Sequence, residues 1–300
     1  MQAGLSILIP VFNHEVAALV GSLLVQVTDW PGPVEIILLD DASQVEYQVK
    51  NRALASLPGV RYAELSANVG RAAIRNQLAA RASYEWLLLL DNDSLLPNDQ
   101  FLARYASAVR TQPTASLFIG GTTYEATPPA DPAQRLRWHY GCAREMRPAA
   151  VRQRDPSGQL TINNALLKSK LLRRFPLDER LSGYGHEDTR LGLELARVGI
   201  EIRHLDNPVL HDGLASATVF LEKSREAVRN LAQVLRTDNL GSDTRLVRAA
   251  QRLRQAGLGR AARATLARVA PALRRNLLSA RPSLRALDLL KLLWLLQELE

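Results

Sequence analysis

The sequence predicts an α/β fold in which helices flank a mostly parallel central sheet, followed by a helical C-terminal extension. Apolar runs rich in Ile, Val and Leu recur at residues 5–11, 34–39, 60–65 and 86–90, each followed by a polar turn and a segment of helical periodicity. From about residue 217 the pattern is helical to the end. Strands that alternate with helices predict a parallel sheet, and the uniform tail predicts a separate helical part.

The apolar runs are continuous rather than alternating, as expected of strands that helices cover on both faces. Downstream, the pattern predicts a helix over 98–111, strands over 116–124, 161–167 and 200–204, and a helix over 187–198 that opens with acidic residues. Residues 126–158, rich in Pro and Arg, receive no assignment. Within the helical tail we expect breaks at Gly241, Gly257 and Pro271.

The composition is that of a folded protein, with 47% hydrophobic and 23% charged residues among 300. Cys142 is the only cysteine, which excludes an intrachain disulfide and a cysteine-rich zinc site, so any metal must use oxygen or imidazole ligands. Pro10 and Asn13 interrupt the first apolar run, and no basic segment precedes it. We therefore expect neither a signal peptide nor a membrane span, and a cytoplasmic protein.

The excess positive charge lies in the tail. The net charge is +8, and residues 236–300 contain 13 Lys and Arg against 5 Asp and Glu, which leaves residues 1–235 neutral. The tail helices could lie on an anionic membrane surface with Trp294 dipping into the interface, or pack on the rest of the chain or on a second subunit. Interleaved aromatic residues are missing, so we expect no nucleic-acid partner.

Polar residues follow each of the first four predicted strands. In open parallel sheets, ligands bind beyond the carboxyl ends of the strands, so these residues are predicted to surround one crevice. They are Phe12, Asn13 and His14; Asp40, Asp41 and Ser43; Asn68, Gly70 and Arg71; and Asp91, Asn92, Asp93 and Ser94.

Two acidic motifs stand out among these residues. Asp91 and Asp93, one residue apart at a strand end, suit one divalent cation that bridges the phosphates of a nucleotide, although Asp and Asn are also common in plain turns. At the second strand, Asp40 or Asp41 could accept hydrogen bonds from a base or ribose, and Ser43 could equally cap the next helix.

Two arginines accompany these carboxylates. Arg71 and Arg75 lie one turn apart at the start of a predicted helix, a geometry suited to an anion or to clamping a loop.

In their order, these motifs resemble those of family 2 glycosyltransferases. The matching segments are Ile9-Pro-Val-Phe-Asn13, Asp40-Asp-Ala-Ser43, Asn68-Val-Gly-Arg-Ala-Ala-Ile-Arg-Asn76, Leu90-Asp-Asn-Asp-Ser94 and, on the acceptor side, Gly183-Tyr-Gly-His-Glu-Asp-Thr-Arg-Leu-Gly192. The resemblance covers roughly residues 5–213. It implies a GT-A fold, with a catalytic domain over residues 1–235 and a basic helical extension over 236–300.

The resemblance also implies an inverting transfer from a nucleotide-sugar, with a UDP-sugar favoured, to a saccharide or lipid-linked acceptor in bacterial-type surface glycan synthesis. Asp188 would be the general base that takes the proton of the acceptor hydroxyl, with Glu187 beside it. The metal, Mn²⁺ or Mg²⁺, would be bound by Asp91, Asp93 and His211, although a lone histidine is more often structural.

The remaining implied site residues fall into two sets. Those that would bind the nucleotide-sugar are Pro10, Phe12, Asn13, Asp40, Asp41, Asn68, Arg71, Arg75, Asp91 and Asn92. Those that would bind the acceptor are Tyr184, Gly185 and His186, and Trp138 or Tyr184 could stack on a sugar ring.

Two positions depart from the family pattern. Ala42 stands where glycine is frequent, and Asn92 stands where small residues are common. Two alternatives stay open, an inactive glycosyltransferase-like binding module and a nucleotidyltransferase. The second would usually carry a glycine-rich phosphate loop after the first strand, where Pro10 and Phe12 stand instead. In the cytoplasm, the basic tail could hold the protein at the inner face of the membrane.

Overall fold

The computed structural model describes residues 3–181, 185–238 and 244–299. The chain divides into two compact units. The sheet unit comprises Met1–Thr123, Met146–Arg180 and Glu187–Gly213, and the helical unit comprises Tyr124–Glu145, Leu181–His186 and Leu214–Glu300. The expected division at residue 235 falls inside helix α9, Ala217–Asp238, because the chain enters the helical unit about 20 residues earlier.

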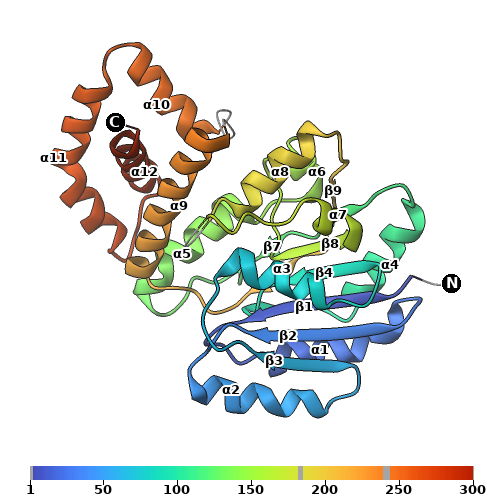
Figure 1. Cartoon of the computed structure of the whole chain (residues 1–300). Coiled ribbons are helices and arrows are strands. Elements are labelled where there is room, and N and C mark those ends of the chain that lie inside the picture. The colour runs from blue at the N-terminus through green and yellow to red at the C-terminus, as the bar shows by residue number, and fades with distance from the viewer. Residues whose placement is uncertain (1–2, 182–184, 239–243, 300) are drawn as a thin grey trace. The chain divides into compact units, whose positions relative to one another are not determined.

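A seven-stranded sheet of order β3-β2-β1-β4-β8-β6-β9 forms the centre of the sheet unit (Figure 1). Its strands are β1 Leu5–Val11, β2 Val34–Asp40, β3 Val60–Glu64, β4 Trp86–Leu90, β6 Leu117–Ile119, β8 Asn164–Lys168 and β9 Arg203–His204. All neighbours are parallel except β8, which runs antiparallel to both β4 and β6. The predicted mostly parallel sheet with flanking helices is confirmed.

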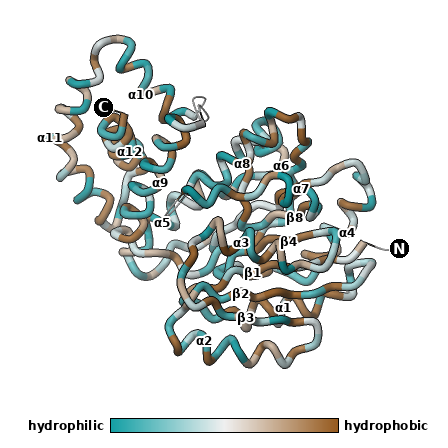
Figure 2. The backbone as a smooth tube through the Cα atoms, viewed as in Figure 1, coloured by the Kyte–Doolittle hydropathy of each residue, from teal (hydrophilic) through white to brown (hydrophobic). Residues whose placement is uncertain are grey.

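Helices cover both faces of this sheet. The helices of the unit are α1 Ala17–Gln26, α2 Val45–Arg52, α3 Arg71–Arg81, α4 Phe101–Thr111, α6 Ala149–Arg152, α7 Ser169–Arg174 and α8 Glu187–Arg197. Alternate residues of β1 pack to opposite sides: Ile7 joins a core with α1 and α4, and Leu8 joins a core with α3, α7 and α8. Burial on both faces explains the continuous apolar runs, which Figure 2 shows in brown along β1 and β4.

A second, three-stranded sheet of order β5-β10-β7 changes two predicted elements. Its strands are β5 Ser94–Leu95, β7 Thr122–Thr123 and β10 Val209–His211. The strand expected over 116–124 is interrupted at Gly120 and Gly121, because Gly121 has a φ of 91° and a Cβ at Gly120 would lie 2.3 Å from the side chain of Asn164. The sequence predicts that His211 lies in a His-Asp-Gly turn after the last strand of the central sheet. In the structure it is instead the last residue of β10, in the small sheet.

The helical unit has its own core. Its helices are α5 Arg135–Tyr140, α9, α10 Arg245–Gln255, α11 Gly259–Leu277 and α12 Leu284–Glu298. Within this unit α12 lies between α9, α10 and α11 (Figure 1), and most of its leucines pack against them. Trp294 is only 8% exposed in this core, so the expected insertion of Trp294 into a lipid interface is wrong: the apolar stripe is already covered by the unit itself.

Two of the expected helix breaks can be compared with the structure. Gly257, with a φ of 72°, ends α10, where Leu258 N donates to Leu253 O and Gly257 N to Arg254 O. Pro271, by contrast, does not break α11, because it lies on the exposed side of the helix, where solvent can satisfy the carbonyl that loses its partner. The third break, Gly241, lies outside the described residues.

The unassigned stretch 126–158 contains short helical pieces. They are the 3-10 helix Pro132–Gln134, α5, the π-helical turn Gly141–Glu145, and α6. None of the helices in the described ranges combines the length and the apolar content that crossing a bilayer requires.

Candidate active site

The carboxyl ends of β1, β2 and β4 meet at one edge of the large sheet. Val11 pairs with Asp40 across β1 and β2, and β1 also pairs in parallel with β4. Strand β8 is antiparallel, so its first residue, Asn164, pairs with Leu90 at the end of β4. The acidic motifs after β2 and β4 therefore share an edge with the start of β8, as the topology of such sheets predicts.

Asp91, the first residue after β4, is held by two arginines of α3. The guanidinium of Arg75 bonds directly to Asp91 Oδ1, and Arg71 Nη2 lies 3.6 Å from Oδ2. Burial raises the pKa of Asp91, but the two guanidinium groups outweigh it and keep the pKa below its ordinary value. Asp91 is therefore ionised at neutral pH.

The two arginines differ in what they can reach. The Arg75 side chain is 2% exposed, and its Nη1 also donates to Arg71 O at 3.0 Å. A buried guanidinium tied to a carboxylate and a carbonyl favours a role in positioning Asp91 over direct contact with a ligand. The Arg71 side chain is 39% exposed, so it can meet a ligand as well.

Arg71 also links the β4 edge to the start of α8. Its Nε donates to Glu187 Oε1 at 2.9 Å, and the Glu187 side chain is 7% exposed. Burial raises the pKa of Glu187, but Arg71 and Arg75 outweigh burial and hold the pKa below its ordinary value. One guanidinium thus joins carboxylates 96 residues apart in sequence, Asp91 and Glu187.

Asp188 has the opposite electrostatic environment. Its Oδ2 accepts a hydrogen bond from Ile162 N at 3.3 Å, while its Oδ1 is buried and has no hydrogen-bond partner in the part of the chain that the structure describes. Burial, followed by the adjacent charge of Glu187, raises the pKa of Asp188 to about 7. Two neighbouring carboxyl groups with pKa values moved apart are the usual mark of divided acid and base roles.

Asp93 and His211 form a second pair at the same motif. His211 Nδ1 lies 3.5 Å from Asp93 Oδ2, and Asp212 N donates to Asp93 O at 2.8 Å, because β5 and β10 are neighbours. The side chain of Asp93 is 33% exposed and that of His211 13%. A carboxylate and an imidazole suit Mn²⁺, so the pair fits a metal whose other ligands come from phosphate and water.

Asp93 and His211 are not joined by a third metal-binding side chain among the described residues. No group of three or more His, Cys, Asp and Glu side chains is close enough to hold a metal ion within residues 3–181, 185–238 and 244–299. Asp91, predicted as a ligand, has its carboxylate engaged by guanidinium groups. A ribose contact by Asp91 and a metal bound by Asp93 and His211 stay predictions.

Asn92, which stands between Asp91 and Asp93 where the family usually has a small residue, connects two strand ends. Its Nδ2 donates to Phe12 O at 3.2 Å, which ties the acidic turn to the end of β1. Phe12 itself is 48% exposed beside this contact. Both residues were predicted to bind the nucleotide-sugar, and they are brought together at the edge that the acidic motifs share.

The second motif clamps the loop before α3. Asp41 accepts from Val69 N at 2.7 Å and from Gly70 N at 3.1 Å, and Asn68 Nδ2 donates to Asp41 O at 3.2 Å. Both oxygens of Asp41 are thus used inside the protein. Asp41 and Asn68 position the loop that leads into Arg71.

Asp40 differs from its neighbour in having an unused oxygen. Its Oδ1 accepts from Ser43 N at 2.7 Å, while its Oδ2 is buried without a hydrogen-bond partner among the described residues. Asp40 thus has an unused oxygen, but its side chain is fully buried, so contact of Asp40 with a base stays a prediction.

The chain around this motif is held in unusual backbone conformations. Ala42 has a φ of 59°, a left-handed value that explains why glycine is frequent at this position. Asn13 has a φ of 48°; its N donates to Ser43 Oγ at 2.9 Å and its Oδ1 accepts from Gln44 N at 2.8 Å. Asn13 therefore joins the ends of β1 and β2, while Pro10 is a partly buried residue inside β1.

The predicted acceptor residues fall elsewhere. Gly185 and His186 belong to the helical unit, where both have positive φ values, 92° and 74°, and Gly185 O accepts from Asn230 Nδ2 at 3.1 Å. Tyr184 lies outside the described residues. Their contact with an acceptor stays a prediction.

Asn163 is a site residue that the sequence did not predict. Its backbone O accepts from Asp91 N at 3.3 Å, and its side-chain Oδ1 is buried with no hydrogen-bond partner within the described ranges. The strand-end residues predicted from the sequence lie at or after the carboxyl end of a strand, whereas Asn163 precedes one. The antiparallel direction of β8 brings it to the same edge, and the only sequence signal is a pair of amides, Asn163 and Asn164, at the start of an apolar run.

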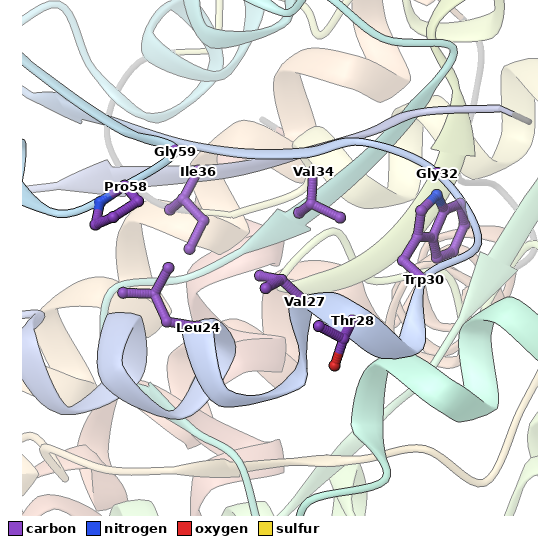
Figure 3. A pocket seen from close by; sticks show the side chains of 9 residues that line it. All are labelled: Leu24, Val27, Thr28, Trp30, Gly32, Val34, Ile36, Pro58 and Gly59. Atoms are coloured by element: carbon purple, nitrogen blue, oxygen red, sulfur yellow. The ribbon is translucent and has the colours of Figure 1, made fainter.

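A hollow at the opposite edge of the sheet has no chemistry of this kind. It has a volume of about 300 Å³ and lies between α1 and the amino ends of β2 and β3, beside Leu24, Val34 and Pro58 (Figure 3). No titratable side chain lines it. The polar edge that holds Asp91, Asp93 and Glu187, and not this apolar hollow, is the candidate active site.

Comparison with solved structures identifies the fold. A mannosyltransferase, PcManGT from Pyrobaculum calidifontis, in complex with GDP-Man and Mn²⁺, superposes with a TM-score of 0.58 at 19% identity, over 97% of this chain and 79% of that one. S. aureus TarS 1-349 superposes with a TM-score of 0.53 at 16% identity, over 99% and 90%. Its complex with UDP-GlcNAc gives 0.51 at 15% identity, over 76% and 66%. At such identities the likeness shows the fold alone, which is GT-A.

The sheet carries acidic residues at the ends of its parallel strands, which is the edge where ligands bind in open sheets of this kind. Residues 6–178 match the model of the family described as Glycosyl transferase family 2. The match covers more than half of the chain, and the chain belongs to this family. A search of curated proteins found no match.

Proposed function

We propose that this protein is an inverting glycosyltransferase that moves a sugar from a nucleoside diphosphate donor to an acceptor hydroxyl, with Asp188 as general base. The observation that carries the proposal is the cluster in which Arg71 joins Asp91 at the end of β4 to Glu187 at the start of α8, beside Asp188. In this cluster, carboxylates that could serve the donor and the acceptor belong to one electrostatic network.

The division of labour between the two α8 carboxylates follows from their surroundings. Glu187 is paired with Arg71 and stays ionised, so it holds the arginine and shapes the local charge. Asp188 has a buried oxygen without a described partner and a pKa of about 7, which matches a group that takes a proton near neutral pH. The acceptor hydroxyl would give its proton to Asp188 as its oxygen attacks the anomeric carbon from the face opposite the leaving diphosphate. That geometry inverts the configuration.

On the donor side, Asp40 and Arg71 are proposed to bind the base and Asp91 the ribose. Asp93 and His211 are proposed to hold Mn²⁺ or Mg²⁺, which would neutralise charge on the leaving phosphates when bound. Both UDP- and GDP-sugars remain candidate donors, because the solved structures with this fold include complexes of each kind. The UDP-sugar favoured by the sequence stays a prediction, as do the saccharide or lipid-linked acceptor and a role in surface glycan synthesis.

A donor panel tests the proposal. UDP- and GDP-sugars are incubated with the purified chain and Mn²⁺, and release of nucleoside diphosphate is measured with and without chelator. We expect release from one donor that chelator suppresses and that Asp188→Asn slows by at least about 100-fold in the presence of acceptor. Donor binding without release under every condition would instead indicate a binding module, and release of pyrophosphate would indicate a nucleotidyltransferase.

We further propose that α10 and α11 hold the protein at an anionic membrane surface, such as the inner face of the cytoplasmic membrane. Residues 245–282 contain ten arginines and no acidic residue. On α10, Arg245, Arg248 and Arg252 are exposed at spacings that place them on one side of the helix. Each basic residue near such a surface contributes about 1 kcal/mol, so several suffice for reversible binding.

Sedimentation with vesicles tests this attachment. We expect binding to vesicles with about one-third phosphatidylglycerol, loss of binding in high salt, and marked weakening when Arg245, Arg248 and Arg252 are all changed to Gln. Equal binding to purely zwitterionic vesicles would contradict the proposal. Failure to bind either vesicle, with a dimer seen in solution, would favour self-association through these helices.

A further inference from the structure

A pocket of about 400 Å³ lies within the helical unit, and nothing in the proposed chemistry uses it. It is formed by two segments far apart in sequence, residues 128–139 and 280–282. Hydrogen bonds hold the segments together: Arg135 Nη1 donates to Ala280 O at 3.3 Å, and His139 Nδ1 lies 3.2 Å from Pro282 O. The pocket is therefore a built feature of the unit. Its volume is near the lower end of the range for small-molecule sites, roughly 300–1,000 Å³.

The walls of the pocket combine a flat apolar surface with positive charge. Trp138, Pro128 and Pro282 supply rigid apolar groups, and Arg135, His139 and Arg281 supply donors. No acidic side chain lines it. This combination disfavours a cation and favours a compact ligand that has an apolar face and a negative group.

The indole of Trp138 is fixed in place. Its Nε1 donates to Glu125 O at 2.8 Å, so the polar edge of the ring is satisfied and its faces are left for stacking. The neighbouring Arg137 lies over the rings of Tyr124 and Phe220, at 5.3 and 5.5 Å, and anchors α5 to the core of the unit. A preorganised aromatic plane loses little entropy when a ligand stacks on it.

Arg135 supplies positive charge to the wall of the pocket. Its Nη1 is used in the bond to Ala280 O, and its Nε is buried away from the pocket surface. What Arg135 offers a ligand is therefore the charge of its guanidinium group. Guanidinium groups bind carboxylates and phosphates in a fork geometry, and Arg281 on the exposed rim adds a second positive charge.

From these observations we propose that the pocket binds an anionic pyranose, a sugar that carries a carboxylate or a phosphate, with the C–H face of the ring on Trp138 and the negative group at Arg135. In the working enzyme this sugar would be a residue of the acceptor glycan. That last role rests on the proposed function, whereas binding itself does not.

Tryptophan fluorescence provides a direct readout. The chain has four tryptophans, and Trp30, Trp86 and Trp294 are buried, so a ligand in this pocket changes mainly the emission of Trp138. The full-length protein is titrated with methyl glucuronide, glucose 6-phosphate, methyl glucoside and UMP, and binding is repeated by calorimetry. We expect both anionic sugars to bind at least about tenfold more tightly than the neutral one.

Single substitutions test whether the sugars bind in this pocket or elsewhere on the protein. Trp138→Ala and Arg135→Gln should each weaken binding of the anionic sugars by about tenfold or more. Trp138→Phe should keep calorimetric binding within a few-fold while losing the fluorescence change, and Arg254→Gln, an exposed arginine of α10 outside the pocket, should bind as the parent does. Melting temperatures near that of the parent exclude unfolding.

Three results would overturn the inference: neutral and anionic sugars that bind equally or not at all, anionic sugars that bind Trp138→Ala as tightly as the parent, or UMP that outcompetes them for this pocket. Metal-dependent donor hydrolysis is measured in parallel on the same variants. Hydrolysis by Arg254→Gln, which lies outside the pocket, should equal that of the parent. A failed sugar titration with intact hydrolysis in the parent refutes the pocket alone, and absent hydrolysis in the parent refutes the proposed function alone.

Discussion

Replacing Asp188 by Asn should stabilise the protein at alkaline pH while it removes activity. In the folded protein the pKa of Asp188 is about 7, mainly through burial and secondarily through the charge of Glu187. The ordinary value of the same group is 3.8. Because the folded state holds this proton more tightly than the unfolded state, stability falls as the pH rises from about 4 to about 7 and is level above that.

The magnitude follows from the same two values. Each pKa unit corresponds to about 1.4 kcal/mol. From pH 5 up to the folded pKa of about 7, the parent loses stability over roughly two pH units, and above that its stability no longer changes. Asparagine has the same shape and no charge. We compare the unfolding free energy of Asp188→Asn with that of the parent at each pH. The difference, variant minus parent, should be up to about 3 kcal/mol larger at pH 8.5 than at pH 5.

Urea unfolding of the parent and Asp188→Asn at the two pH values measures this difference, and transfer activity is measured on the same samples. Glu187→Gln is the matched control with the opposite sign. The pKa of Glu187 is lowered, so its removal should destabilise the protein at neutral pH, and this loss should shrink as the pH falls through its folded pKa.

The same control also acts on catalysis. Since Glu187 helps to raise the pKa of Asp188, the ascending limb of kcat/KM, expected near pH 7 in the parent, should move to lower pH in Glu187→Gln. The reasoning is refuted if Asp188→Asn shows the same pH dependence of stability as the parent. Full activity in a folded Asp188→Asn protein would remove Asp188 as the base.

Further predictions concern the surrounding residues. Asp93→Ala should lower turnover by at least about 100-fold and raise the Mn²⁺ concentration needed for half-maximal activity; an unchanged metal titration would exclude Asp93 as a ligand. Ala42→Gly should raise the unfolding free energy by about 1 kcal/mol, because glycine adopts the left-handed φ of 59° without strain. The control Ala80→Gly, at an exposed position of α3, should lower the unfolding free energy by a similar amount. Urea unfolding midpoints of the two variants and the parent measure both changes. Arg75→Met should destabilise the fold by about 3 kcal/mol, because it leaves the Asp91 charge without its buried partner; a loss below about 1 kcal/mol would contradict that pairing.

The sequence alone was enough to predict the sheet and the position of its polar edge. Continuous apolar runs such as residues 5–11 and 86–90 identify strands buried on both faces, and in a parallel sheet the residues directly after each strand lie at the ligand edge. These rules are local, or depend on strand direction alone. They therefore located Asp40, Asp91 and Asp93 without coordinates.

Other features could be decided only by the tertiary structure, because they depend on contacts between distant segments. The antiparallel direction of β8 brings Asn163 to the site. The packing of α3 buries Arg75 against Asp91, whereas the sequence pattern gives no reason to distinguish Arg75 from Arg71. Likewise, α12 finds its apolar partners within the helical unit, which a hydrophobic pattern cannot specify. The pKa values of Glu187 and Asp188 diverge for the same reason: a charge from α3, more than 100 residues away, reaches one of two adjacent carboxylates more closely than the other.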